Sequence, residues 1–144
     1  MTDRRPGEPL PRNSSTLVRE AARRIDTVGQ DEAEELLNDP DVLFVDVRDP
    51  RELARDGMIP GAFHAPRGLL EFWIDPECPY YKPALDSGQK LVLYCGSGWR
   101  SALSAAALCD MGLPNVSHLE GGFSAWRDAG RAVAADQRTR PADR

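Results

Sequence analysis

Short apolar runs alternate with amphipathic segments through the middle of the chain. The strand candidates are 41–47 (DVLFVDV), 90–95 (KLVLYC) and 115–121 (NVSHLEG), with a shorter extended segment at 62–66 (AFHAP). Helical patterns separate them and lie at 31–38, 50–57, 68–73, 101–112 and 123–130. Continuous apolar strands that alternate with helices predict an α/β fold, an open parallel sheet with helices on both faces.

The two ends of the chain lack this pattern. Residues 1–26 predict a flexible lead-in that is rich in Pro, Arg, Ser and Gly at its start, with one short helix over 17–25. Residues 131–144 predict a flexible, solvated tail. The predicted domain therefore occupies 27–130, a length that supports a single hydrophobic core.

Charge and composition narrow the choice of partners. A net charge of −5 argues against a broad nucleic-acid-binding face. We expect no membrane contact and a cytoplasmic location, because no apolar stretch could span a bilayer and none follows the basic N-terminus. The three cysteines form no CxxC motif and no zinc-like cluster with His64 or His118, so we expect no metal and a reduced compartment.

The segment from Cys95 to Ser101 (CGSGWRS) joins the end of a predicted strand to a predicted helix. Gly96 and Gly98 allow the backbone to curl so that successive N–H groups point inward and form an anion nest. The helix N-terminus and Arg100 add positive potential, and these effects favour a thiolate at Cys95. A structural cysteine in the core is the alternative, but it accounts for neither the flanking glycines nor the arginine.

Four motifs occur in an order that resembles the rhodanese family over 27–130. They are DVRDPRE (46–52), GMIPGAFHAP (57–66, with Met58 where the family usually has His), CGSGWRS (95–101) and EGGFSAW (120–126). The resemblance implies a persulfide relay. A donor such as thiosulfate or 3-mercaptopyruvate gives its outer sulfur to Cys95, and a thiol or cyanide removes it. No cofactor is implied.

The length of the loop bears on the reaction that the resemblance implies. Four residues separate Cys95 from Arg100, as in the sulfurtransferases, whereas related phosphatases and arsenate reductases have one residue more. An alternative within the same family is a persulfide-carrying or regulatory module. Such a module hands sulfur to a protein partner with little turnover of small molecules.

Several further residues receive roles in the predicted site. Gly96, Ser97, Gly98, Trp99 and Arg100 are expected to cradle the persulfide, with Ser97 as a hydrogen-bond donor and Trp99 as an apolar wall.

The supporting residues lie outside the loop. Asp46 and Arg48 follow a strand, and we expect Arg48 to pair with Glu52 and brace the loop from behind. Arg67 either guides an anionic donor or is an ordinary surface arginine. His64 and His118 are interpreted as structural.

Overall fold

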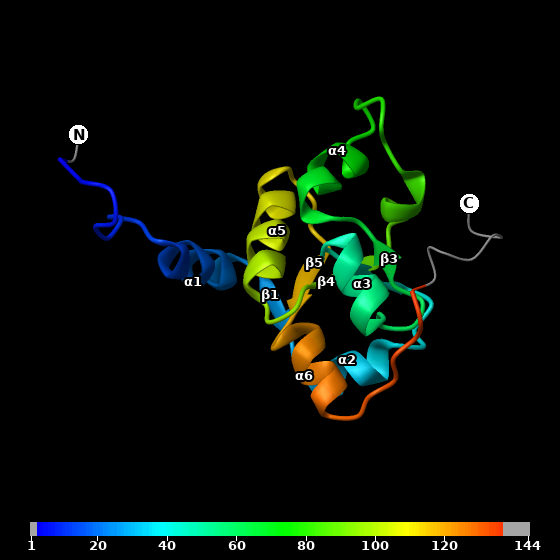
Figure 1. Cartoon of the computed structure of the whole chain (residues 1–144). Coiled ribbons are helices and arrows are strands. Elements are labelled where there is room, and N and C mark those ends of the chain that lie inside the picture. Colours follow the sequence, from blue (N-terminus) through cyan, green and yellow to red (C-terminus); the bar gives the residue numbers. More distant parts are fainter. Residues whose placement is uncertain (1–2, 137–144) are drawn as a thin grey trace.

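A parallel sheet forms the centre of the protein in the computed structural model, which describes residues 3–136 (Figure 1). Its strands are β1 (Asp26–Val28), β2 (Val42–Asp46), β3 (Phe63–His64), β4 (Lys90–Tyr94) and β5 (Val116–Leu119). They lie in the order β1-β5-β4-β2-β3, and each neighbouring pair is parallel. The predicted α/β class with an open parallel sheet is confirmed.

Helices connect the strands. They are α1 (Ser14–Arg24), α2 (Gln30–Leu36), α3 (Pro50–Asp56), α4 (Leu70–Ile74), α5 (Trp99–Asp110) and α6 (Gly122–Asp128), with 3₁₀ turns η1 (Arg67–Leu69) and η2 (Pro83–Leu85). Each predicted helix is present with small shifts at its ends. The predictions missed β1 and η2, which are both very short.

Two apolar layers cover the faces of the sheet, because successive side chains in a strand point to opposite sides. Val45, Leu91 and Leu93 pack with α4 and α5 in one layer. Phe44, Val92 and Tyr94 pack with α2 and α6 in the other, where Phe123 and Trp126 are almost fully buried. The sheet is therefore covered by helices on both faces.

Helix α1 and the segment after α6 both contact this domain. Helix α1 packs on α5 through Val18 and Ala21, and Figure 1 shows it beside α5 with the N-terminal segment leading away. At the other end, Met58 and Ala134 exchange two backbone hydrogen bonds of 2.9 and 2.8 Å. Residues 131–136 are thus bonded to the domain, whereas 137–144, the rest of the predicted tail, lie outside the described residues.

Crossing a lipid bilayer requires a helix of greater length and apolarity than any in the described part of the chain.

Candidate active site

Cys95 directly follows β4 at the C-terminal end of the sheet, where ligands bind in open α/β folds. Its Sγ accepts hydrogen bonds from the backbone N–H groups of Gly98 (3.1 Å) and Ser101 (3.4 Å). The cysteine is 1% exposed. Gly98 has φ +111°, a left-handed conformation that glycine adopts without strain and that starts α5. The sulfur therefore sits in a small nest of N–H donors at a helix start.

A buried polar chain continues from the sulfur. The Cys95 thiol lies 3.6 Å from Ser101 Oγ, which in turn lies 3.1 Å from His118 Nδ1. Burial lowers the pKa of His118, which favours its neutral form. The neutral ring shares a hydrogen bond with the Ser101 hydroxyl, and its tautomer decides which of the two groups donates. Ser101 had no role among the residues predicted from the sequence. The available signal was a serine at the start of a helix and a histidine, His118, inside an otherwise apolar strand.

Backbone N–H groups at the start of α6 form hydrogen bonds with the cysteine loop. Phe123 N–H donates to the carbonyl of Cys95 (2.8 Å) and Ser124 N–H to that of Gly96 (2.9 Å). Gly122, with φ +63°, permits this approach, since a Cβ there would lie 2.6 Å from the Gly96 oxygen and 2.7 Å from the Cys95 oxygen. The Gly-Gly pair of the EGGFSAW motif therefore sets the shape of the cysteine loop.

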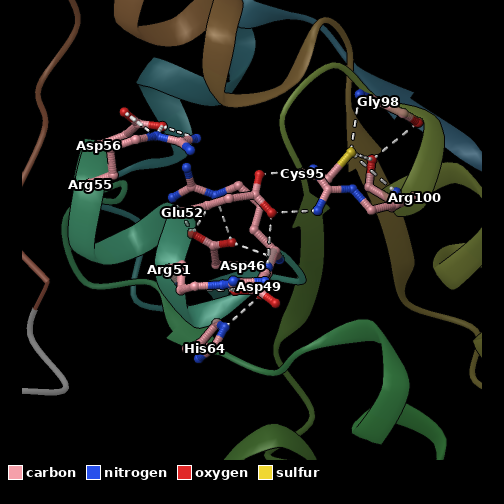
Figure 2. A network of polar contacts seen from close by, with 12 residues as sticks. Asp46, Asp49, Arg51, Glu52, Arg55, Asp56, His64, Cys95, Gly98 and Arg100 are labelled. Carbon is pink, nitrogen blue, oxygen red and sulfur yellow. Dashed lines mark hydrogen bonds and ion pairs between the residues drawn. The ribbon is translucent and has the colours of Figure 1, made fainter.

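Arg100 turns toward α3. Its guanidinium donates to both carboxylate oxygens of Glu52, at 2.7 and 3.0 Å, and Figure 2 shows this pair beside the cysteine loop. The hydrogen bonds from Arg100 lower the pKa of Glu52 despite its partial burial. Glu52 also accepts from Asp49 N–H and closes a capping box at the start of α3. The positive charge of Arg100 is thus largely neutralised by a carboxylate from another element.

The predicted pairing of Arg48 with Glu52 is wrong. Arg48 is buried and pairs with Asp46 at 2.8 Å, donates to the Gly57 carbonyl at 2.7 Å, and lies over the ring of Phe123 at 4.2 Å. The arginine turned inward because the carboxylate at the end of β2 offers a buried, bidentate partner. Asp46 and Arg48 hold together the corner of the fold between β2 and α3.

The remaining predicted site residues lie at the surface around the loop. Ser97 is exposed, and Trp99 is 69% exposed at the start of α5. Arg67 lines a cavity together with Trp99 and Arg100, so the structure brings these three side chains to one surface. The hydrogen bonds to Cys95 Sγ come from Gly98, which the predicted cradle included, and from Ser101, which it did not.

The two other thiols have different surroundings. Cys78 and Cys109 are partly exposed and unpaired. Burial raises the pKa of Cys109, which favours its protonated form. Among the described residues, no group of three or more His, Cys, Asp or Glu side chains is placed to hold a metal ion.

A parallel α/β domain with a cysteine nest at a strand end defines a small set of protein classes. The family model of the Rhodanese-like domain matches residues 29–129. The chain belongs to this family, as the four sequence motifs predicted.

The relatives and solved structures that this chain resembles carry different descriptions. A sulfurtransferase of Allochromatium vinosum is 34% identical over 105 residues, 73% of this chain and 90% of the relative. A thiosulfate sulfurtransferase, GlpE, of Shewanella oneidensis is 35% identical over 88 residues, 61% of this chain and 78% of the relative. A solved structure from Rhodopseudomonas palustris, described as a protein of unknown function and possible tyrosine phosphatase, has 48% identity and a TM-score of 0.84. It aligns over 88% of this chain and 98% of its own.

Proposed function

We propose that this protein is a sulfurtransferase that carries sulfane sulfur on Cys95. The donor is a small molecule such as thiosulfate or 3-mercaptopyruvate, and the acceptor is a thiol or cyanide. The reaction needs no cofactor, nucleic acid or membrane, and we place it in the cytosol. The observation that carries the proposal is the position of Cys95 Sγ within hydrogen-bond reach of two backbone N–H groups.

The proposed reaction has two half-steps, loading of Cys95 with sulfur and transfer of that sulfur to the acceptor. The Cys95 thiolate attacks the outer sulfur of thiosulfate, the S–S bond of the donor breaks, and sulfite leaves with the bonding electron pair. The product is a Cys95 persulfide with one negative charge on its terminal sulfur. An acceptor thiolate then attacks that sulfur, and Cys95 leaves as a thiolate. Each half-step passes one sulfur atom and needs no external oxidant.

The nest supports both half-steps. Backbone N–H groups aimed at a developing anion stabilise it without reorganisation, and here they come from Gly98 and Ser101. Ser101 Oγ connects the thiol to His118 and provides a route for the proton when Cys95 ionises. Arg100 acts mainly through Glu52, so the backbone supplies most of the positive potential at the sulfur.

Phosphatase activity is the alternative that the description of the Rhodopseudomonas palustris structure raises. Four residues between Cys95 and Arg100 make a smaller loop than the phosphatases of this family use. The Arg100 guanidinium, which a phosphate would need, is held by both oxygens of Glu52. Both observations favour sulfur as the substrate atom.

Mass spectrometry of the intact protein tests the proposal. Thiosulfate or 3-mercaptopyruvate, added without an acceptor, should increase the mass by one sulfur atom. Peptide mapping should place that atom on Cys95, and cyanide or a thiol should restore the original mass. Cys95→Ser should show neither the adduct nor thiocyanate production, because a hydroxyl forms no persulfide. Cys78→Ser and Cys109→Ser serve as matched controls that keep both.

Three outcomes separate the proposal from its rivals. An unchanged mass with both donors, while the protein is folded and reduced, would show that the persulfide mechanism is wrong. Hydrolysis of an aryl phosphate that depends on Cys95 would favour the phosphatase. A persulfide that forms on Cys95 but turns over slowly with every small thiol would identify the alternative from the same family, a module that hands sulfur to a protein partner.

A further inference from the structure

Helix α1 lies outside the part of the chain that matches the family, since the match begins at residue 29 and α1 ends at Arg24. It is nevertheless part of the fold. Its apolar side packs on α5 through Val18 and Ala21, and Arg24 forms an ion pair with Asp110 near the other end of α5. A helix outside the family match thus lies beside the helix that begins at the cysteine loop.

Helix α1 lines one side of an open cavity of about 390 Å³, which Trp99 and Arg100 of the cysteine loop also line. One wall comes from the first two turns of α1, with Ser14, Ser15 and Arg19. Arg67 and Trp99, which lies at the start of α5, also line the cavity. Organic ligands occupy pockets above roughly 300 Å³. Thiosulfate is a small inorganic anion and would leave most of this volume unfilled.

The cavity combines positive charge with apolar surface. Within residues 3–136, neither Arg19 nor Arg67 is in ion-pair contact with a carboxylate. Neither guanidinium charge is therefore neutralised by a carboxylate there, and Arg19 donates one long hydrogen bond, of 3.4 Å, to Thr16 Oγ1. The exposed indole of Trp99 and the side chains of Val18 and Leu103 give the same cavity its apolar surface. This combination fits an organic anion better than a neutral molecule or a bare inorganic ion.

We propose that this cavity binds the sulfur acceptor, and that the acceptor is a low-molecular-weight thiol carrying carboxylates. The inference rests on the proposed function and names its substrate class. The carboxylates contact Arg19 and Arg67, the carbon skeleton lies against Trp99, and the thiolate attacks the terminal sulfur of the Cys95 persulfide. That attack breaks the S–S bond to Cys95, so the acceptor leaves as a persulfide anion.

The test compares an anionic and a neutral thiol on the full chain, with thiosulfate as donor. Glutathione is the anionic probe and 2-mercaptoethanol the neutral one. Arg19→Ala should raise the KM for glutathione about three-fold, the range expected for one exposed ion pair. Arg19→Glu should raise it about ten-fold, because it adds repulsion. Higher salt should raise the KM of the unchanged protein for glutathione but not for 2-mercaptoethanol.

Arg23→Ala is the matched control, since Arg23 lies on the same helix, is exposed and does not line this cavity. It should leave both KM values unchanged. The inference is overturned if Arg19→Glu leaves the KM for glutathione unchanged or raises both thiols' KM equally. It is also overturned if 2-mercaptoethanol discharges the loaded persulfide while glutathione does not. Failure of thiosulfate to load Cys95 would instead refute the proposed function itself.

Discussion

Replacing Gly122 by alanine tests whether the start of α6 sets the shape of the cysteine loop. Two unfavourable effects add at this position. The left-handed backbone, φ +63°, costs an alanine about 1 kcal/mol or somewhat more. The new Cβ would also lie 2.6–2.8 Å from backbone atoms of Cys95 and Gly96, which cannot rotate away as a side chain can. Overpacking of this kind adds roughly 1–3 kcal/mol.

Gly122→Ala should therefore lower the free energy of unfolding by about 2–4 kcal/mol. Gly130→Ala separates the two effects, because Gly130 has φ +75° and an added Cβ there would have no atom within 4 Å. That control should lose only about 1 kcal/mol. Urea unfolding of both variants measures the difference.

A second measurement links the substitution to function. The folded Gly122→Ala variant should react more slowly with iodoacetamide at Cys95 and load less sulfur from thiosulfate, because a displaced loop misplaces its N–H groups. Gly130→Ala should match the unchanged protein in both assays. Equal losses of stability in the two variants, with unchanged cysteine reactivity, would refute the reasoning that Gly122 shapes the loop.

Three further predictions concern charged and titratable groups. Glu52→Gln should accelerate alkylation of the loop cysteine at neutral pH, since it leaves the positive charge of Arg100 unpaired; an unchanged rate would mean that this charge does not reach the sulfur. Asp46→Asn should lower the free energy of unfolding by about 3–5 kcal/mol in urea, because Arg48 stays buried with its charge uncompensated, and a loss under about 1 kcal/mol would contradict this. Burial lowers the pKa of His118 from its ordinary value of 6.5. As the pH falls from 6.5 toward the lowered pKa of the folded protein, the imidazole of the unfolded chain is protonated before that of the folded protein. Stability should drop by up to about 1.4 kcal/mol per pH unit in that window, and His118→Gln should flatten the drop.

The sequence predicted the parts of the site that lie close together along the chain. Cys95, Gly98 and Arg100 lie within one strand–loop–helix segment, so their chemistry and spacing indicated a nest before any tertiary contact was known. The same holds for the helix that begins at Pro50, where a capping residue and a proline mark the start. Local patterns of this kind depend on backbone geometry alone.

Contacts between distant segments were predicted less well. A spacing of four residues favoured the pairing of Arg48 with Glu52, yet Glu52 pairs with Arg100, which is 48 positions away. Ser101 and His118 are 17 positions apart and meet only because β4 and β5 are neighbours. Strand β1 escaped prediction because three residues, two of them exposed, carry no readable alternation.

The hydrogen bonds between Met58 and Ala134 have a consequence for how the protein can be shortened. A fragment cut to the family match, 29–129, would lose the segment that covers Gly57 as well as helix α1. The carbonyl of Gly57 holds the buried guanidinium of Arg48, so uncovering it would let water reach an ion pair that is otherwise dry. We therefore expect a fragment that keeps this corner of the fold dry and retains α1 to extend beyond the family match at both ends.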